Sequence, residues 1–138
     1  MERWMFGEKS DELLNKVINK SKTATSSLYN NEKSKVGEKS IIMNSLKQDK
    51  CLIEIVDYKI LSFKDMTEDL VVLEGEGNLE TWQSIHKRFF SNRLGITEDC
   101  FNEKTKILFE IFKVIKVFNN NFMTKNIPKK LVNEVTRK

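Results

Sequence analysis

Two long segments of the chain, residues 51–58 and 106–118, carry the apolar pattern of β-strands. The second mixes strict alternation with apolar pairs, which is typical of a long and partly buried strand. Residues 79–90 instead repeat their large apolar side chains at every third or fourth position and predict an amphipathic helix. Shorter patterns predict a helix over residues 11–18, capped by Ser10 or Asp11, a strand over 23–29, a further apolar run at 41–43 and a helical turn at 63–66.

Strands outnumber helices in a chain of 138 residues, which is the size of one domain. We therefore expect an α+β fold, a small and mostly antiparallel β-barrel with flanking helices. No apolar run reaches the roughly 20 residues of a membrane span, so we expect no membrane partner. Cys51 and Cys100 lie far apart without a CxxC pairing, which favours two free thiols and a cytoplasmic location.

The net charge of +4 is concentrated at the C-terminal end of the chain. Residues 119–138 contain five cations and one acid, so residues 1–118 contain nineteen of each. A broad basic surface for duplex binding is therefore not supported, although a local basic patch is compatible with the sequence. The tail is expected to be a short basic helix from Lys129 onward or a loose extension.

A first candidate site is the sequence Lys22-Thr23-Ala24-Thr25, at a helix-to-strand junction. One interpretation is structural, with a solvated lysine at a helix end and threonines chosen for their strand propensity. The functional alternative makes Lys22 a base or phosphate donor and places the Thr25 hydroxyl beside it. Residues three apart on a regular strand face opposite sides, so the two share a pocket only if Lys22 lies in the turn.

A second candidate site is the sequence Glu74-Gly75-Glu76-Gly77, before the predicted helix at residues 79–90. The glycines allow the backbone to bend and to approach a ligand closely. The carboxylates could divide acid and base roles if their environments differ. The alternative is an acidic loop that interacts favourably with the N-terminus of the next helix.

The aromatic residues leave two interpretations open. Trp82 and His86 share a helix face with Phe89 and Phe90, where packing in the core is the default expectation. Trp4 and Phe6 could stack on a base or close the barrel. No second histidine exists to share a metal ion, so we expect no metal site and no cofactor.

Taken in order, these segments resemble the ASCH family, a branch of the PUA-like superfamily. The resemblance extends over roughly residues 4–118. Each motif alone is loose, but their order and spacing make the combination specific. The matching segments are Phe6-Gly7, the helix 11–18, Lys22 to Leu28, Val36-Gly37-Glu38, Ile53-Glu54-Ile55, Phe63, Glu74 to Gly77, and Trp82 through His86 to Phe89-Phe90-Ser91.

The resemblance implies a PUA-like barrel over residues 1–118, followed by a basic extension at 119–138. Some family members are amidohydrolases that deacetylate acetylated cytidine with a Lys, a Thr and a Glu, and others are ribonucleases. Carried over by motif, Lys22, Thr25 and Glu76 are the expected catalytic residues, with Glu74 the alternative acid. The residues expected to contact substrate are Trp4, Phe6, Thr23, Ser27, Glu74, Trp82 and His86. Where the family has a glycine before the lysine, this chain has Lys20. We therefore expect the positive φ of that glycine either at Asn19 or at no residue of this turn.

Three functions are compatible with these features. The first is a module that binds RNA, a nucleoside or a nucleotide, and the second is an amidohydrolase or ribonuclease. The third is a small-molecule sensor or structural protein in which the pocket is vestigial. We expect a monomer or a weak dimer.

Overall fold

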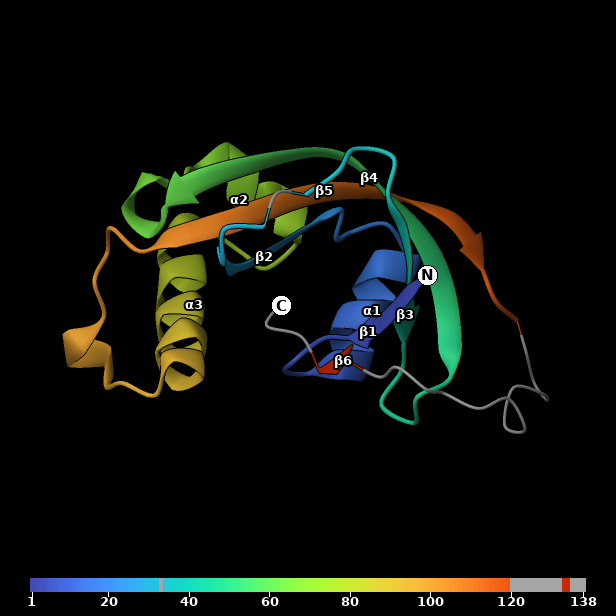
Figure 1. Cartoon of the computed structure of the whole chain (residues 1–138), viewed down its shortest axis with the longest axis horizontal. Helices are drawn as coiled ribbons and strands as arrows, with labels where there is room; N and C mark the ends of the chain where they lie inside the picture. The colour runs from blue at the N-terminus through green and yellow to red at the C-terminus, as the bar shows by residue number, and fades with distance from the viewer. Residues whose placement is uncertain (33, 120–132, 135–138) are drawn as a thin grey trace.

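The computed structural model describes residues 1–32, 34–119 and 133–134 and contains one sheet in the order β2-β5-β4-β3-β1-β6 (Figure 1). The neighbouring pairs β2–β5, β5–β4 and β4–β3 are antiparallel, whereas β1 pairs in parallel with both β3 and β6. The strands are β1 (Glu2–Met5), β2 (Ala24–Leu28), β3 (Lys39–Met43), β4 (Asp49–Ser62), β5 (Lys106–Val117) and β6 (Asn133–Glu134). The helices are α1 (Ser10–Ile18), α2 (Glu68–Glu74) and α3 (Leu79–Leu94), with 3-10 turns at Phe63–Asp65 and Glu98–Cys100.

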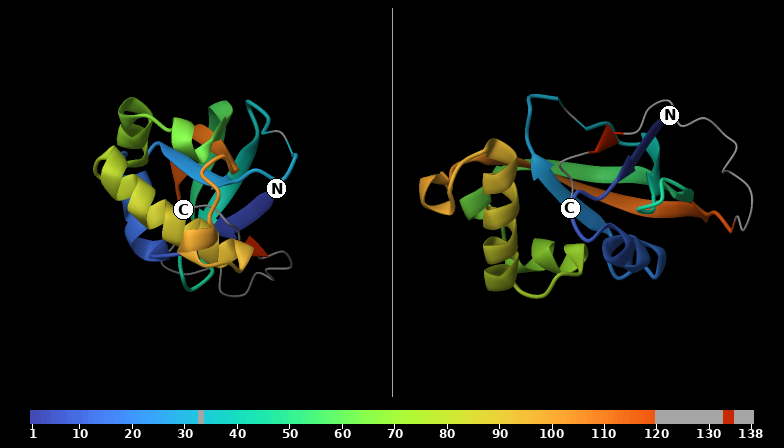
Figure 2. Two further views of the ribbon diagram at one scale, coloured as in Figure 1. Left: turned by 90° about the vertical axis from the view of Figure 1, so that its left-hand side faces the viewer. Right: turned by 90° about the horizontal axis from the view of Figure 1, so that it is seen from below.

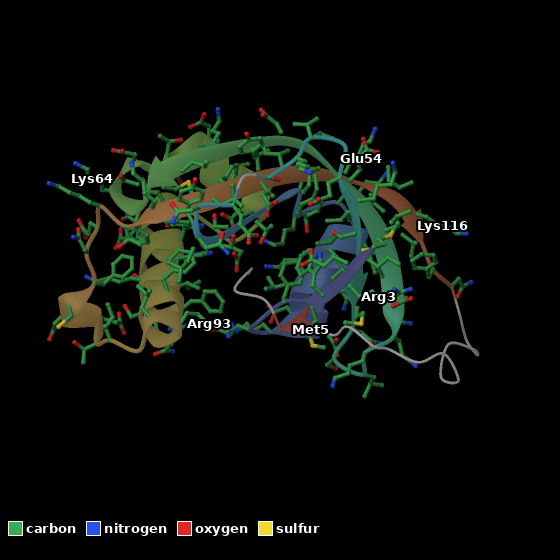
Figure 3. The ribbon with its side chains drawn as sticks, viewed as in Figure 1. Arg3, Met5, Glu54, Lys64, Arg93 and Lys116 are labelled. Carbon is green, nitrogen blue, oxygen red and sulfur yellow. The ribbon has the colours of Figure 1, made fainter. Side chains whose placement is uncertain are left out.

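The long β4–β5 ribbon curves over the rest of the molecule (Figure 1). Its register shifts twice, between Leu52 and Ile53 and between Ile55 and Asp57. Each shift inserts an unpaired residue, which bends the strand and increases its twist. Lys64 and Lys116 lie near opposite ends of this ribbon and point away from the molecule (Figure 3). The sheet is thereby curled into a half-barrel whose concave side faces the helices.

Two hydrophobic cores lie beneath the two halves of the curled sheet. Helices α1 and α3 cover different halves, and α2 lies between them in the right-hand view of Figure 2. The α1 core contains Trp4, Phe6, Leu13, Leu14, Val17, Ile42, Cys51, Ile53, Ile55 and Phe112. The α3 core contains Ala24, Phe63, Met66, Val71, Trp82, Phe89, Phe90, Phe101, Ile107 and Phe109. Polar residues between the two cores are therefore enclosed without belonging to either.

None of the helices in residues 1–32 and 34–119 combines the length and the apolar character needed to cross a membrane. Helix α3, the longest, has 16 residues and includes several charged side chains. Its buried side includes Trp82, His86, Phe89 and Phe90, as the 3.6-residue spacing predicts.

The expected α+β architecture is confirmed, with a mostly antiparallel, curled sheet and flanking helices. Several features differ from the sequence-based prediction: β4 is longer than residues 51–58, and β1 and α2 were not predicted. The N-cap of α1 is Lys9, so the prediction that Ser10 or Asp11 caps this helix was wrong. Helix α2 contains four consecutive apolar residues, Leu70 to Leu73, which give no helical periodicity. Strand β1 is only four residues long, which is too short to show a clear strand pattern in the sequence. It is held in the sheet by its pairing with β3.

The expected helix from Lys129 falls on residues that lie mostly outside the described part of the chain. Within the range that was expected to be helical, Asn133 and Glu134 are described, and they form β6 and pair with Trp4 and Met5 of β1. The division of the chain at residue 118 stays a prediction.

A left-handed residue ends α1 and turns the chain toward Lys22. Lys20 has φ of 69°, so the positive-φ position is Lys20 itself, and the expectation that Asn19 or no residue would adopt it was wrong. The backbone N–H of Lys20 donates to the Val17 carbonyl, and that of Ser21 to the Lys16 carbonyl. This pair of bonds is the Schellman motif, in which glycine is the usual left-handed residue.

Replacing Lys20 with glycine is expected to stabilise the protein. A side chain in the left-handed region costs roughly 1–2 kcal/mol, and part of this gain is offset by the greater freedom of glycine in the unfolded chain. We therefore expect Lys20→Gly to raise the free energy of unfolding by about 0.5–1 kcal/mol in urea denaturation. Lys20→Ala, which keeps the Cβ atom, is the matched control and should give no comparable gain. Equal stability of the two variants would contradict the account.

Candidate functional site

Four ionisable side chains meet in the buried space between the two cores. Lys22 follows α1, Glu74 ends α2, Glu76 lies in the turn after α2, and His86 is on α3. The Lys22 amine lies 3.4 Å from a Glu74 carboxylate oxygen and 3.9 Å from one of Glu76. The Nε2 atom of His86 lies 3.6 Å from Glu74 and 3.9 Å from Glu76. We call these four residues the Lys22 cluster.

Glu74 is the centre of the Lys22 cluster. Its Oε2 atom accepts hydrogen bonds from the Ser26 hydroxyl at 2.5 Å and from the Trp82 indole at 2.9 Å. Its Oε1 atom faces Lys22 and His86. Both oxygens of a fully buried carboxylate are thus contacted by donors or positive charge, as burial of this group requires.

His86 is held in one orientation by Trp82, one helical turn before it. Its ring stacks on the Trp82 ring with centroids 4.2 Å apart, and its Nδ1 atom lies 2.9 Å from the Trp82 carbonyl oxygen. A carbonyl only accepts, so Nδ1 carries the proton and donates. Burial lowers the pKa of His86, and the nearby Glu74 and Glu76 carboxylates offset only part of that effect. The neutral ring therefore directs the Nε2 lone pair at the two acids.

Gly75 allows the two acids to converge on the cluster. It has φ of 69°, and a Cβ atom at this position would overlap the carbonyl oxygen of Ser21. The turn therefore packs directly against the backbone that leads into Lys22. The Lys16 amine donates to the Gly75 carbonyl at 3.2 Å and fastens the turn to α1.

A polar cavity of about 180 Å³ opens beside Glu76. Glu76 has a side chain that is 6% exposed, whereas those of Lys22, Glu74 and His86 are fully buried. Of the Lys22 cluster, Glu76 alone lines this cavity. Its other lining residues are Glu8, Lys9, Glu12, Leu13, Lys16, Gly75, Gly77, Ile85 and Arg88.

Thr25 lines a second, much smaller cavity, which borders the α1 core. That cavity, of about 10 Å³, is also lined by Trp4, Ser40 and Glu110. Thr25 pairs with Glu110 across β2 and β5, and the Glu110 carboxylate accepts a hydrogen bond from the Ser34 hydroxyl at 2.8 Å. Strand alternation points Thr25 to the face opposite Ser26, which contacts Glu74.

Phe6 and Trp4 connect the Lys22 cluster with the cavity at Thr25. The Lys22 amine lies 5.6 Å from the centroid of the Phe6 ring, which packs edge-on against Trp4. The Trp4 indole donates to the Ser40 hydroxyl at 3.0 Å. Both aromatic residues are core side chains in this structure, with Trp4 1% and Phe6 2% exposed.

The other residues expected to contact substrate have structural partners. The Thr23 hydroxyl and backbone N–H both donate to the Leu73 carbonyl and fasten the start of β2 to α2. Ser27 is buried within β2, opposite Leu108. Sequence reasoning missed Ser26 and Glu110. An acid in the middle of a buried strand was the available signal for Glu110, whereas nothing distinguishes Ser26 from its neighbours in β2.

The sequence model of the ASCH domain matches residues 2–116. The chain belongs to the ASCH domain family. A protein from Enterococcus faecalis V583, EF3133, has a similar structure with a TM-score of 0.75 and 24% identity, covering 88% of this chain and 84% of that one. An ASCH domain from Lactobacillus crispatus JV V101 has a TM-score of 0.71 and 26% identity, covering 82% of this chain and 79% of that one. No curated protein matches the chain significantly.

The hypothetical protein PH0355 is a more distant structural relative of this ASCH domain. It gives a TM-score of 0.59 at 17% identity, covering 83% of this chain and 100% of that one. Together these comparisons establish the ASCH fold, which is PUA-like, for this chain.

The packing of Gly75 against Ser21 can be tested with two alanine variants of the ASCH domain. Gly75 and Gly95 each follow a helix with nearly the same backbone angles, but a Cβ atom at Gly95 would meet nothing within 4 Å. Gly95→Ala is expected to lower the free energy of unfolding by about 1 kcal/mol, the cost of the left-handed conformation alone. Gly75→Ala is expected to lower it by about 2–4 kcal/mol because overpacking is added.

Urea denaturation of the two variants measures this difference directly. Equal losses at Gly75 and Gly95 would contradict the close approach of the turn to the Lys22 backbone.

Proposed function

We propose that this ASCH domain binds one nucleoside unit, free or within single-stranded RNA, in the cavity beside Glu76. The observation that carries the proposal is the Lys22 cluster, whose buried charged and hydrogen-bonding groups lie behind Glu76, the one member of the cluster that lines the polar cavity. Edges of nucleobases are recognised by such groups in single-stranded RNA. We further propose that the protein acts in the cytoplasm.

The charges around the cavity favour a base and sugar over a run of phosphates. Three acids and three cations line it: Glu8, Glu12, Glu76, Lys9, Lys16 and Arg88. Phosphate backbones are bound by clustered cations, which this balanced set does not provide. A cavity of about 180 Å³ is also below the 300–1,000 Å³ typical of larger ligands. Both features support a single nucleoside as the bound unit.

A second candidate function is hydrolysis of an acylated nucleoside such as acetylated cytidine. It is favoured by the acid–base groups of the Lys22 cluster, because buried titratable groups with charged partners concentrate at catalytic sites. The Lys22 ammonium, ion-paired with two carboxylates, is a donor, so it is suited to stabilise an oxyanion. This assigns Lys22 a different role from the base expected by motif.

In this reaction Glu76, at the cavity, accepts a proton from water as the water oxygen attacks the acyl carbon. The carbonyl oxygen becomes an oxyanion, whose charge is stabilised electrostatically by the Lys22 ammonium, which lies 3.9 Å from the Glu76 carboxylate and does not itself line the cavity. The C–N bond then breaks, and the proton held by Glu76 passes to the leaving amine. The products are the unmodified nucleoside and acetic acid, which releases a proton to water and becomes acetate, and no cofactor is consumed.

The test is incubation of the purified chain with acetylated cytidine and chromatography for cytidine. Lys22→Met should lower kcat/KM by about 10²–10³-fold, as loss of an oxyanion donor does. Glu76→Gln should lower it by about 10²–10⁴-fold through loss of the base. Lys64→Met is the control, because Lys64 points away from the molecule (Figure 3) and should leave the rate unchanged.

Thr25→Val separates the two routes of attack. If water attacks the acyl carbon, the hydrolysis rate of Thr25→Val should stay within about tenfold of the wild-type rate. If the Thr25 hydroxyl is the nucleophile, this variant should lose hydrolysis completely. Absence of cytidine release by folded wild-type protein would contradict hydrolysis of this substrate. Nucleoside binding would then be tested by calorimetry, where absence of binding to cytidine and acetylated cytidine would contradict the primary proposal.

A further inference from the structure

We propose that Glu74, Glu76 and His86 form a binding site for one divalent transition-metal ion, in competition with the Lys22 ammonium. The inference goes beyond nucleoside binding and does not depend on it. A single histidine argued against a metal ion at the level of the sequence. The fold adds two carboxylates to that histidine, from a turn and a helix end that lie ten or more residues earlier in the chain.

The three donor atoms lie close enough together to bind one small cation. One oxygen from each carboxylate and one histidine nitrogen all lie within 4.8 Å of one another, and the residues are buried. Nε2 of His86 is 3.6 Å from Glu74 and 3.9 Å from Glu76. Donors about 2.0–2.2 Å from a tetrahedral zinc ion are separated by about 3.3–3.6 Å. The pair at 3.6 Å already lies at the edge of that range, and an inward movement of a few tenths of an ångström brings the pair at 3.9 Å into it.

The outer atoms of two donors are already fixed by other residues. The Nδ1 proton of His86 is donated to the Trp82 carbonyl, which leaves Nε2 as the inward-facing atom. The Oε2 atom of Glu74 accepts from Ser26 and from the Trp82 indole, which leaves Oε1 facing inward. Metal-binding histidines and carboxylates are oriented by hydrogen bonds of this kind on the side away from the ion.

The inward atom of His86 gives an independent indication that a partner is missing at this point. Among the described residues, Nε2 is buried and has no hydrogen-bond partner. With the proton on Nδ1, Nε2 is an acceptor, and its nearest charged neighbours are carboxylate oxygens that are also acceptors. Acceptors directed at one another are favourable only when a proton or a cation lies between them. A metal ion at this point would give Nε2 a partner and would also contact both carboxylates.

The donor set selects the class of ion. One imidazole nitrogen with two carboxylate oxygens suits Zn²⁺, Co²⁺, Fe²⁺ or Mn²⁺, whereas Mg²⁺ prefers oxygen donors and retained water. Three protein donors leave at least one coordination position open, and Glu76 borders the cavity through which an ion and a ligand could enter.

Lys22 gives the proposal a distinctive signature. Its ammonium lies within 4 Å of both carboxylates, where the charge of an added ion would act. The ion must displace or move this ammonium, so removing the positive charge should strengthen metal binding. An unrelated metal site elsewhere on the chain would not respond in this way.

The experiment is isothermal titration of metal-free, full-length protein with Zn²⁺ at pH 7, without nucleoside. We expect one bound ion per chain, binding at least tenfold tighter in Lys22→Met, and binding at least tenfold weaker in Glu76→Gln and in His86→Phe. Phenylalanine keeps an aromatic ring on Trp82, and circular dichroism verifies that each variant is folded. Addition of Co²⁺ should give the visible absorption of a site with nitrogen and oxygen donors.

Two controls exclude other sources of binding. Lys64→Met should leave the affinity unchanged, since Lys64 points outward, and so should Cys100→Ser, which removes the exposed thiol. The proposal is overturned if neither the wild-type chain nor Lys22→Met binds Zn²⁺ below millimolar concentration. It is also overturned if folded His86→Phe binds as tightly as wild type. Because no nucleoside is present, either outcome leaves the nucleoside proposal to be judged by its own assay.

Discussion

The buried carboxylate of Glu74 is the interaction on which the arrangement of the elements depends. It accepts from Ser26 on β2 and Trp82 on α3, and it faces Lys22 and His86. Removing a charge from water costs several kcal/mol, which is offset only when its partners are held in good geometry. Strand β2 and helices α2 and α3 must therefore meet in one arrangement, and the same contacts that locate them also assemble the candidate site.

The polar cluster is enclosed because it lies between two hydrophobic cores. Phe6 from the α1 core lies beneath the Lys22 amine, and Trp82 from the α3 core stacks on His86. In such surroundings the interactions among charges are stronger than they are in water. Glu76 links these enclosed groups to a polar cavity, so a ligand can reach them from one side. This combination of enclosure and a single contact with the cavity supports recognition of a small ligand over binding along a surface.

The sequence could predict the elements with strong periodicity and the motifs at their ends. The strand patterns at 51–58 and 106–118 and the spacing in α3 follow from burial of one face, and the glycine-flanked acids signal a close turn. The contacts across the sheet could not be predicted, because Ser26 and Glu110 acquire roles only through partners 48 and 76 residues away. Lys20 shows a different limit: the Schellman bonds of α1 impose a left-handed conformation on a residue whose own preference opposes it.

The two tryptophans offer the most direct test of where a ligand binds. The Trp82 indole donates to Glu74 in the Lys22 cluster, whereas the Trp4 indole donates to Ser40 beside the cavity of Thr25. A ¹H–¹⁵N spectrum contains one indole signal for each, assigned with Trp4→Phe and Trp82→Phe. During titration with acetylated cytidine, the account predicts a saturable shift of the Trp82 signal. A shift confined to Trp4, or no shift of either signal at saturating nucleoside, would contradict the assignment of the Lys22 cluster as the binding site.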